Sequence, residues 1–332
     1  MILAGIDEAG YGPTLGPLVV SVTVFRVEAP AGAPTESQAP DLWHTLRNVV
    51  DRKPDGRNIA VNDSKKLFTQ KRGLRHIEEG LLPFVWLTTP KPPRTLRALI
   101  DALVPCTNKT ATAYLDDYLW YAQRDADLPS GTYPGAVAAR RERLAECLES
   151  SGVEVVGLRS CPLEVFEFNS ALEAEANNKA NVSFRAIGAF LKQLWKSFPD
   201  EPVDVVVDRQ GGRRYYGPQL FRAVGPRSLR VETQTENCSI YGLTRRGNGS
   251  SPFRVTFTTK GDALSLPVAL ASMLSKYVRE LHMGLFNEFW REHLADLKPT
   301  AGYAVDARRF LREIAPLRRR LEIDDRRLVR QR

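Results

Sequence analysis

The stretch Ile2-Leu3-Ala4-Gly5-Ile6-Asp7-Glu8-Ala9-Gly10-Tyr11-Gly12-Pro13 indicates how the rest of this chain is organised. A short apolar run ends in two adjacent carboxylates, and a turn with two glycines follows them. A second apolar run, Pro17-Leu18-Val19-Val20-Ser21-Val22, begins soon afterwards. This pattern predicts a strand, a tight turn and a second strand, with Asp7 and Glu8 where the first strand meets the turn.

These two carboxylates have two interpretations. In a strand, successive side chains point to opposite faces, so Asp7 and Glu8 cannot both lie on one side of a regular strand. They are either surface acids at a solvated strand end or part of a site that distant segments complete.

The composition is that of a globular protein with ample material for a core, since 43% of its 332 residues are hydrophobic and 26% are charged. Lys and Arg number 47 against 39 Asp and Glu, which gives a formal net charge of +8. That excess permits a polyanionic partner without requiring one. No apolar run approaches the roughly 18 residues of a membrane span, and no signal peptide is apparent. We therefore expect a cytoplasmic protein with no membrane contact.

Cysteines and histidines are scattered along the chain. Cys106, Cys147, Cys161 and Cys238 form no CxxC pair, and no cluster of histidines accompanies them. We expect neither a zinc site nor a disulfide framework. We therefore also expect the protein to reside in a reducing compartment.

Strand-like and helix-like segments alternate, and the first two strands suggest a hairpin, which predicts a mixed sheet with helices on both faces. Further strands are expected at 83–88, 153–158, 203–207, 229–233 and 254–258. Helices are expected at 69–81, 95–103, 110–123, 136–150, 171–195 and 264–289, the last with Pro267 in its first turn. We expect one domain over 1–300, with insertions near 29–60 and 89–151, and a basic extension over 301–332.

Two further carboxylates stand at the ends of predicted elements. Asp208 ends the apolar run 203–207, which is typical of a buried central strand. Asp262 opens the helix at 264–289, where it could equally be an N-cap. If these two converge with Asp7 and Glu8, their mutual repulsion requires cations. Oxygen ligands without nearby His or Cys favour Mg²⁺ or Mn²⁺ over zinc, and two such ions would suit phosphoryl transfer.

Three other features could contact a ligand, and each also has a plainer interpretation. The glycines of Gly10-Tyr11-Gly12 let backbone approach a phosphate or a ribose hydroxyl, although the spacing is not the dinucleotide fingerprint. The segment Asp63-Ser64-Lys65-Lys66 is either an N-cap with a solvated first turn or a helix N-terminus facing a phosphate. Glu280 is a fifth candidate carboxylate, but a solvated helical glutamate is the simpler interpretation.

Six segments in this order resemble the type 2 ribonucleases H, namely ribonuclease HII and ribonuclease HIII. They are GIDEAGYGP at 5–13, GPLVV at 16–20, NDSKKL at 62–67, VVVD at 205–208, KGDA at 260–263 and ASMLSKYVRE at 271–280. Gly302-Tyr303 resembles a further element near the C-terminus. The stretches 29–60 and 89–151 and the last twenty residues find no counterpart.

This resemblance implies an α/β protein with the RNase H-like fold, a central mixed five-stranded sheet flanked by helices, with insertions and a helical C-terminal extension. Members hydrolyse the RNA strand of RNA–DNA hybrids, and ribonuclease HII also incises at ribonucleotides embedded in duplex DNA. The products carry 3′-hydroxyl and 5′-phosphate ends. By position, the catalytic residues and ligands of two Mg²⁺ or Mn²⁺ ions would be Asp7, Glu8, Asp208 and Asp262.

The same resemblance implies substrate contacts. Gly10, Tyr11 and Gly12 would meet the ribose 2′-hydroxyl, the group that separates RNA from DNA. Ser64 and Lys65 would hold phosphates with help from Lys276, and Tyr303 would pack against the sugar. Most ribonuclease HII sequences carry Arg where this chain has Tyr11, and the match around Tyr303 is two residues long. The aspartate at 262 is as in ribonuclease HII.

Two rival functions share this fold. One is a diverged nucleic-acid-binding protein without catalysis, which Tyr11 and the insertions would suit. Its weakness is the intact carboxylate set, because clustered acids without metal repel each other. The other is a nuclease that acts on DNA alone. The arginine-rich segment 301–332 is either a solvated amphipathic helix or a phosphate-tracking extension. We expect a monomer.

Overall fold

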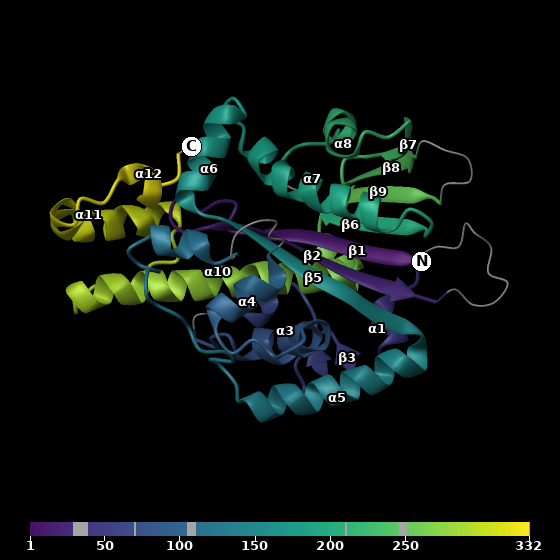
Figure 1. Ribbon diagram of the computed structural model, residues 1–332, viewed down its shortest axis with the longest axis horizontal. Helices are drawn as coiled ribbons and strands as arrows, with labels where there is room; N and C mark the ends of the chain where they lie inside the picture. The colour runs from purple at the N-terminus through teal and green to yellow at the C-terminus, as the bar shows by residue number, and fades with distance from the viewer. Residues whose placement is uncertain (29–38, 70, 105–110, 210, 246–250, 332) are drawn as a thin grey trace.

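The computed structural model describes residues 1–28, 39–69, 71–104, 111–209, 211–245 and 251–331. A mixed sheet with helices on both faces forms its centre (Figure 1). The α/β class and the mixed sheet are confirmed, but the expected five strands are wrong, because the described residues form seven in the order β5-β2-β1-β6-β9-β8-β7. Their bounds are β1 (Ile2–Ala9), β2 (Leu18–Val27), β5 (Val153–Leu163), β6 (Val203–Asp208), β7 (Ser228–Gln234), β8 (Cys238–Thr244) and β9 (Phe253–Thr258).

The helices surround this sheet, and a two-residue parallel pair, β3 (Val50–Asp51) and β4 (Ile59–Ala60), stands apart from it. The first half of the chain contributes α1 (Leu42–Thr45), α2 (Ser64–Leu67), α3 (Arg75–Thr88), α4 (Leu96–Leu103), the 3₁₀ helix η1 (Ala113–Asp117) and α5 (Pro134–Ser151). The second half contributes α6 (Val165–Ala174), α7 (Lys179–Ser197), α8 (Gly217–Val224), α9 (Gly261–Leu264), α10 (Leu266–His293), α11 (Ala304–Arg320) and α12 (Asp325–Leu328).

Strand β1 lies in the interior of the sheet, between β2 and β6. It pairs antiparallel with β2, which confirms the predicted hairpin, and parallel with β6 on its other side. Strand β9 is parallel to β6 in turn. Because parallel strands end at the same edge, the carboxyl ends of β1, β6 and β9 come together there.

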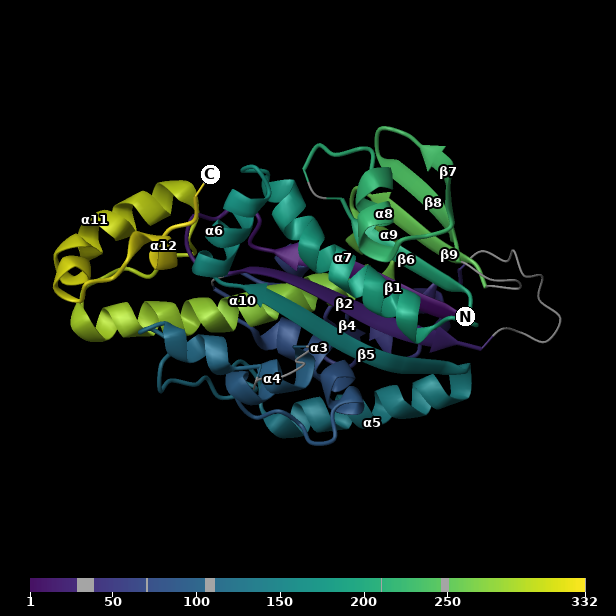
Figure 2. The same ribbon diagram turned by 45° about the horizontal axis from the view of Figure 1, so that its top comes forward.

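The two faces of β1 bury different residues. Ile2, Ala4 and Ile6 pack in a core cluster with α7, whereas a side chain at Gly5 would meet α10. Figures 1 and 2 show these two helices on opposite faces of the sheet. Alternation along the strand therefore sends Asp7 to the α10 side, where its carbonyl accepts a 3.0 Å hydrogen bond from Ser275 Oγ.

Most of the long helices lie where the sequence predicts them. Helix α4 matches 95–103, α5 matches 136–150, and α10 matches 264–289 with Pro267 in its first turn. Within the described ranges, no helix is long and apolar enough to cross a membrane. The three cysteines that the structure describes are free thiols, and Cys106 lies outside the described residues.

The segment 83–88 is helical, so the predicted strand there is wrong. It forms the second half of α3, which contains Pro83 and buries every residue from Ile77 to Trp86. A short apolar run cannot be told from a buried helix by its pattern alone. The helix begins at Arg75, six residues later than expected from 69–81.

The single helix predicted at 171–195 is two helices, α6 and α7. Ala176 and Asn177 between them adopt φ of 50° and 59°. Asn178 then caps α7, since its side chain accepts hydrogen bonds from the N–H groups of Ala180 and Asn181. The Asn-Asn pair is the signal for this break, because asparagine tolerates left-handed backbone and is a preferred N-cap.

Two other differences have local causes. Strand β8 was not predicted, because one of its three buried inward positions is the polar Ser239, which weakens the apolar alternation. In the segment predicted as a helix over 110–123, the described part holds only η1, and Thr110 lies outside the described residues.

A buried glutamate joins the second insertion to the core. The carboxylate of Glu78 accepts hydrogen bonds from Ser130 N at 2.7 Å, Gly131 N at 2.6 Å and Tyr277 Oη at 2.9 Å. Buried carboxylates require such partners. Glu78 therefore ties the loop before α5 to the middle of α10.

Candidate active site

A cavity of about 230 Å³ lies at the edge of the sheet where β1 and β6 end. Larger hollows of about 270 and 520 Å³ lie over α7, and each is lined by a single carboxylate. The cavity at the sheet edge is therefore the candidate active site because of the side chains that line it, and not because of its volume. The cavity at the sheet edge is lined by all eleven residues that the sequence proposes for catalysis or substrate contact: Asp7, Glu8, Gly10, Tyr11, Gly12, Ser64, Lys65, Asp208, Asp262, Lys276 and Tyr303.

The sheet topology brings the carboxylates to one edge. Asp208 is the last residue of β6, and Asp262 lies in α9, directly after β9. The Oδ1 atom of Asp208 accepts a 2.7 Å hydrogen bond from Gly261 N, which fixes the end of β6 to α9. Asp262 is therefore not the N-cap of α10, because Ser265 occupies that position.

Asp7 is not a solvated acid at a strand end, because only 7% of it is exposed. Burial raises its pKa well above the usual range, and the charges of Glu8 and Asp208 raise it further. Hydrogen bonds from Ser272 and from the N–H of Glu8 oppose this shift. Glu8, the next residue and the last but one of β1, lines the same cavity.

The other two carboxylates are shifted in the same direction. Burial raises the pKa of Asp208 to about 6; the Gly261 N–H opposes the shift and the charge of Asp262 adds to it. Burial also raises the pKa of Asp262, followed by repulsion from Asp63, while Lys65 opposes the shift. A positive charge placed among these groups would stabilise their ionised forms.

The donor set fits a hard divalent cation in its chemistry. Among the residues that the structure describes, no three His, Cys, Asp or Glu side chains form a ready-made metal-binding group. Five carboxylates nevertheless line one cavity, the four proposed ligands and Asp63, and the described lining holds no histidine or cysteine. Oxygen ligands of this kind suit Mg²⁺ or Mn²⁺.

The raised pKa values predict how the metal-free protein responds to pH. The pKa of Asp208 rises from 3.8 to about 6 in the folded state, so the folded state binds its proton more tightly than the unfolded chain. Its contribution to stability is complete below pH 3.8 and is lost as pH rises through 6. We expect Asp208→Asn to be more stable than the wild type at pH 7 by about 3 kcal/mol, and equally stable near pH 4.

Urea unfolding in EDTA between pH 4 and 7 measures this difference. Asp101→Asn, an exposed aspartate on α4, serves as the control and should follow the wild type at every pH. A constant difference between Asp208→Asn and the wild type across this range would contradict the prediction.

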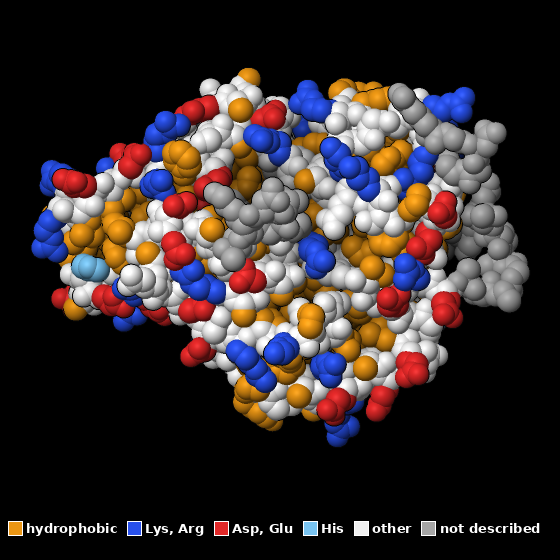
Figure 3. All heavy atoms as spheres, in the orientation of Figure 1, with side chains coloured by type: hydrophobic (Ala, Val, Ile, Leu, Met, Phe, Trp, Pro, Cys, Tyr) orange, Lys and Arg blue, Asp and Glu red, His pale blue; other side chains and the backbone are white. Residues whose placement is uncertain are grey.

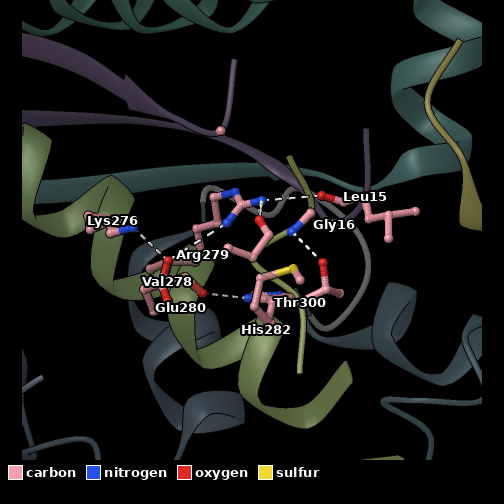
Figure 4. A network of polar contacts seen from close by, with 12 residues as sticks. Leu15, Gly16, Lys276, Val278, Arg279, Glu280, His282 and Thr300 are labelled. Carbon is pink, nitrogen blue, oxygen red and sulfur yellow. Dashed lines mark hydrogen bonds and ion pairs between the residues drawn. The ribbon is translucent and has the colours of Figure 1, made fainter. Parts of the chain in front are cut away.

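The glycine turn after β1 is packed tightly against α10. Gly10 has φ of +85°, and a Cβ there would lie 2.4 Å from Arg279 Nε. Only glycine fits this position. Arg279, 2% exposed, donates from Nη2 to Leu15 O at 3.2 Å, a contact visible in Figure 4. Tyr303, 55% exposed, lies beside the turn, with its ring 4.0 Å from a Cβ built at Gly12.

The structure shows the cap in the segment 63–66, and the contact with a phosphate stays a prediction. Asp63 is the N-cap of α2 and accepts a 2.9 Å hydrogen bond from Lys65 N, as the plainer interpretation requires. Ser64 is buried, and its Oγ lies 3.2 Å from Ser272 Oγ of α10. Lys65 is exposed at the mouth of the cavity.

One face of α10 contributes residues that were not predicted from the sequence. Ser272 and Arg279 line the cavity together with Lys276. Their spacing of four and three residues places them on one side of a helix, and this spacing is the signal that could have identified them. Asp63 was considered only as a cap, yet it also lines the cavity.

Glu280 is ion-paired rather than solvated. Its side chain is 18% exposed, and its Oε1 lies 2.7 Å from Lys276 Nζ and 3.7 Å from Arg279 Nη1 (Figure 4). It does not line the cavity. Glu280 therefore orients Lys276 and Arg279 by ion pairing, from outside the cavity lining.

No protein-family model matches this sequence, and no curated protein matches it. Solved structures with a similar fold include ribonuclease HII in its PCNA complex from Archaeoglobus fulgidus, 16% identical over 100% of this chain and 95% of that chain, with a TM-score of 0.41. Ribonuclease H2 from Pyrococcus horikoshii OT3 is 14% identical over 99% and 92% of the chains, with a TM-score of 0.44. Bst-RNase HIII in complex with Mn²⁺ is 15% identical over 94% and 62%, with a TM-score of 0.34. These likenesses concern the fold alone.

Proposed function

We propose that this protein is a divalent-metal-dependent endoribonuclease. Its substrate would be the RNA strand of an RNA–DNA hybrid or a ribonucleotide within duplex DNA, and its products would carry 3′-hydroxyl and 5′-phosphate ends. The observation that carries this proposal is the cavity in which four carboxylates from three distant segments meet the glycine turn. Binding without cleavage does not require so many clustered acids, because without a metal they repel each other.

Asp7, Glu8, Asp208 and Asp262 would hold the metal ions. When bound there, Mg²⁺ or Mn²⁺ would supply the charge needed to activate a water and to stabilise the leaving oxygen of a phosphodiester. Lys65 and Lys276 also line the cavity, and their ammonium groups would bind the flanking phosphates. The backbone of the turn and the exposed ring of Tyr303 would contact the sugar.

The test is cleavage of a labelled DNA duplex that contains one ribonucleotide, alongside an RNA–DNA hybrid and an all-DNA duplex. We expect cleavage of the first two with Mg²⁺ or Mn²⁺, none in EDTA, and none of the all-DNA duplex. Equal cleavage of all three would favour a nuclease that acts on DNA. Binding of the hybrid without turnover would favour the nucleic-acid-binding alternative.

The exposed face of α11 would extend the phosphate-binding surface away from Tyr303. Its inward face buries Phe310, Ile314 and Leu317, so α11 is amphipathic, as one of the two interpretations of this segment requires. The outward face carries arginines at 308, 312 and 319. On the side of the molecule in Figure 3, acidic and basic side chains are interspersed, so charge alone does not locate the nucleic acid there.

Replacing Arg308, Arg312 and Arg319 together with glutamine should weaken binding of the duplex. If all three contact phosphates, the slope of log K against log salt should fall by about 3. Fluorescence anisotropy over a series of salt concentrations measures this slope. The matched control replaces three exposed lysines elsewhere, Lys91, Lys192 and Lys196, and an equal slope in the two triple variants would count against the proposal.

A further inference from the structure

The end of the chain returns to the glycine turn and binds its carbonyl groups. Arg330 is 3% exposed. Its Nε donates to Gly16 O at 2.8 Å, its Nη1 donates to Gly10 O at 2.5 Å, and its Nη2 also donates to Gly16 O. Its backbone N–H donates to Thr14 O at 2.9 Å. One residue near the C-terminus thus holds three carbonyls of the turn that follows β1.

Helix α6 holds this last segment in place. Asn169 Nδ2 donates to Arg326 O at 3.0 Å and to Val329 O at 2.9 Å, and its Oδ1 accepts from Gln331 N at 2.8 Å. The Arg330 guanidinium lies over the ring of Phe168, 4.9 Å from its centre. Both views show α12 beside α6 (Figures 1 and 2). Asn169 therefore holds the backbone on both sides of Arg330, and Phe168 packs against its guanidinium, so the position of Arg330 is fixed.

A second buried guanidinium supports the turn from α10. Arg279 Nη2 donates to Leu15 O and to Ala301 O, at 3.2 and 3.1 Å. Glu164, which is also buried, interacts electrostatically with both Arg279 and Arg330. Burial raises the pKa of Glu164 to about 8, against the opposing pull of these two cations. The turn from Gly10 to Gly16 is thus held by two buried guanidinium groups from separate segments, Arg279 of α10 and Arg330 near the C-terminus.

Peptide geometry connects this support to the cavity. The carbonyl of Gly10 and the N–H of Tyr11 belong to one trans peptide plane and point in opposite directions. Arg330 binds the Gly10 carbonyl from the buried side and does not line the cavity, whereas Tyr11 does. Within the described residues, the Tyr11 N–H donates to no backbone carbonyl. This N–H is therefore directed away from Arg330 and is available to an oxygen of a ligand.

We propose that Arg330 is a positioning residue for sugar recognition. By holding the Gly10 carbonyl, it directs the Tyr11 N–H to a hydroxyl or phosphate oxygen of the nucleotide at the scissile bond. The inference rests on the proposed function, because it assigns the ligand of that same cavity. It also separates one arginine of the C-terminal segment from the others, because Arg330 acts from the interior and not on the surface.

The first test is independent of nuclease activity. In the full-length protein, Arg330→Gln should accelerate amide hydrogen exchange at Thr14 and Leu15, whose N–H groups bind Gly302 O, by about tenfold or more. Exchange in β6 should stay unchanged. Arg326→Gln, an exposed arginine paired with Glu173, is the matched control and should leave exchange in the turn unchanged. Unchanged exchange in Arg330→Gln would overturn the structural part of the inference.

The second test measures recognition. Arg330→Gln should raise KM for the duplex with one ribonucleotide by about tenfold, with a smaller change in kcat, and Arg330→Lys should restore part of the loss. In an Asp208→Asn background, the preference for this duplex over all-DNA should fall by a similar factor. Faster exchange with unchanged KM and preference would overturn the recognition role. A wild type that neither cleaves nor prefers the ribonucleotide would instead refute the proposed function, and the exchange result would still decide whether Arg330 supports the turn.

Discussion

Asp208→Asn is expected to reduce cleavage of a ribonucleotide-containing duplex by about a thousandfold or more while the protein remains folded. Asp208 ends the central strand β6 and interacts with both Asp7 and Asp262, so its charge is shared between the two halves of the carboxylate set. Asparagine keeps the shape of the side chain and an acceptor for Gly261 N. It removes the negative charge that would attract the metal ions. The variant therefore tests the effect of that charge on cleavage separately from any effect on folding.

Single-turnover cleavage and thermal unfolding with and without Mg²⁺ measure the two consequences. Mg²⁺ should raise the melting temperature of the wild type and should raise that of Asp208→Asn much less, because ligand binding stabilises only a state that binds it. Asp204→Asn is the matched control, since Asp204 lies in the same strand but does not line the cavity. Undiminished cleavage by Asp208→Asn, or an equal loss in Asp204→Asn, would refute a special role for Asp208.

The parts of the site that the sequence predicts are those marked by local patterns. An apolar run followed by an acid identifies the ends of β1 and β6, and parallel pairing of these strands accounts for the meeting of Asp7 and Asp208. Similarly, helical spacing along α10 could have added Ser272 and Arg279 to Lys276. In each case the side chain lies where the period of its own element sends it.

Arg330 shows what local patterns cannot predict. It lies 320 residues from Gly10 in sequence, in a segment where most arginines are on the surface. Nothing in the letters around it distinguishes a buried arginine from an exposed one. Its partners are backbone carbonyls, which leave no trace in the sequence. The strand predicted at 83–88 was wrong for a related reason, because the surrounding core and not the segment's own pattern makes it helical.

Gly5→Ala is expected to destabilise the protein by about 3 to 5 kcal/mol. A Cβ at Gly5 would lie 2.1 Å from the backbone nitrogen of Val268 and 2.2 Å from the backbone carbon of Pro267. Both atoms belong to the first turn of α10, which is also fastened to the sheet by a 2.7 Å hydrogen bond from Thr23 Oγ1 to Pro267 O. No side-chain rotation relieves such a clash, so the helix must move away from the sheet.

Urea unfolding and cleavage at a temperature where the variant is still folded test this prediction. Gly157→Ala in β5 is the matched control, because a Cβ there meets nothing within 4 Å, and its stability should change by less than about 1 kcal/mol. Equal stability of the two variants would show that the close approach is unnecessary. Activity should fall further than stability explains, because α10 carries Ser272, Lys276 and Arg279 to the cavity and a displacement of about 1 Å can cost about a hundredfold in rate. Gly5, which allows α10 to approach the sheet, and Asp7, which faces α10, lie on the same face of β1.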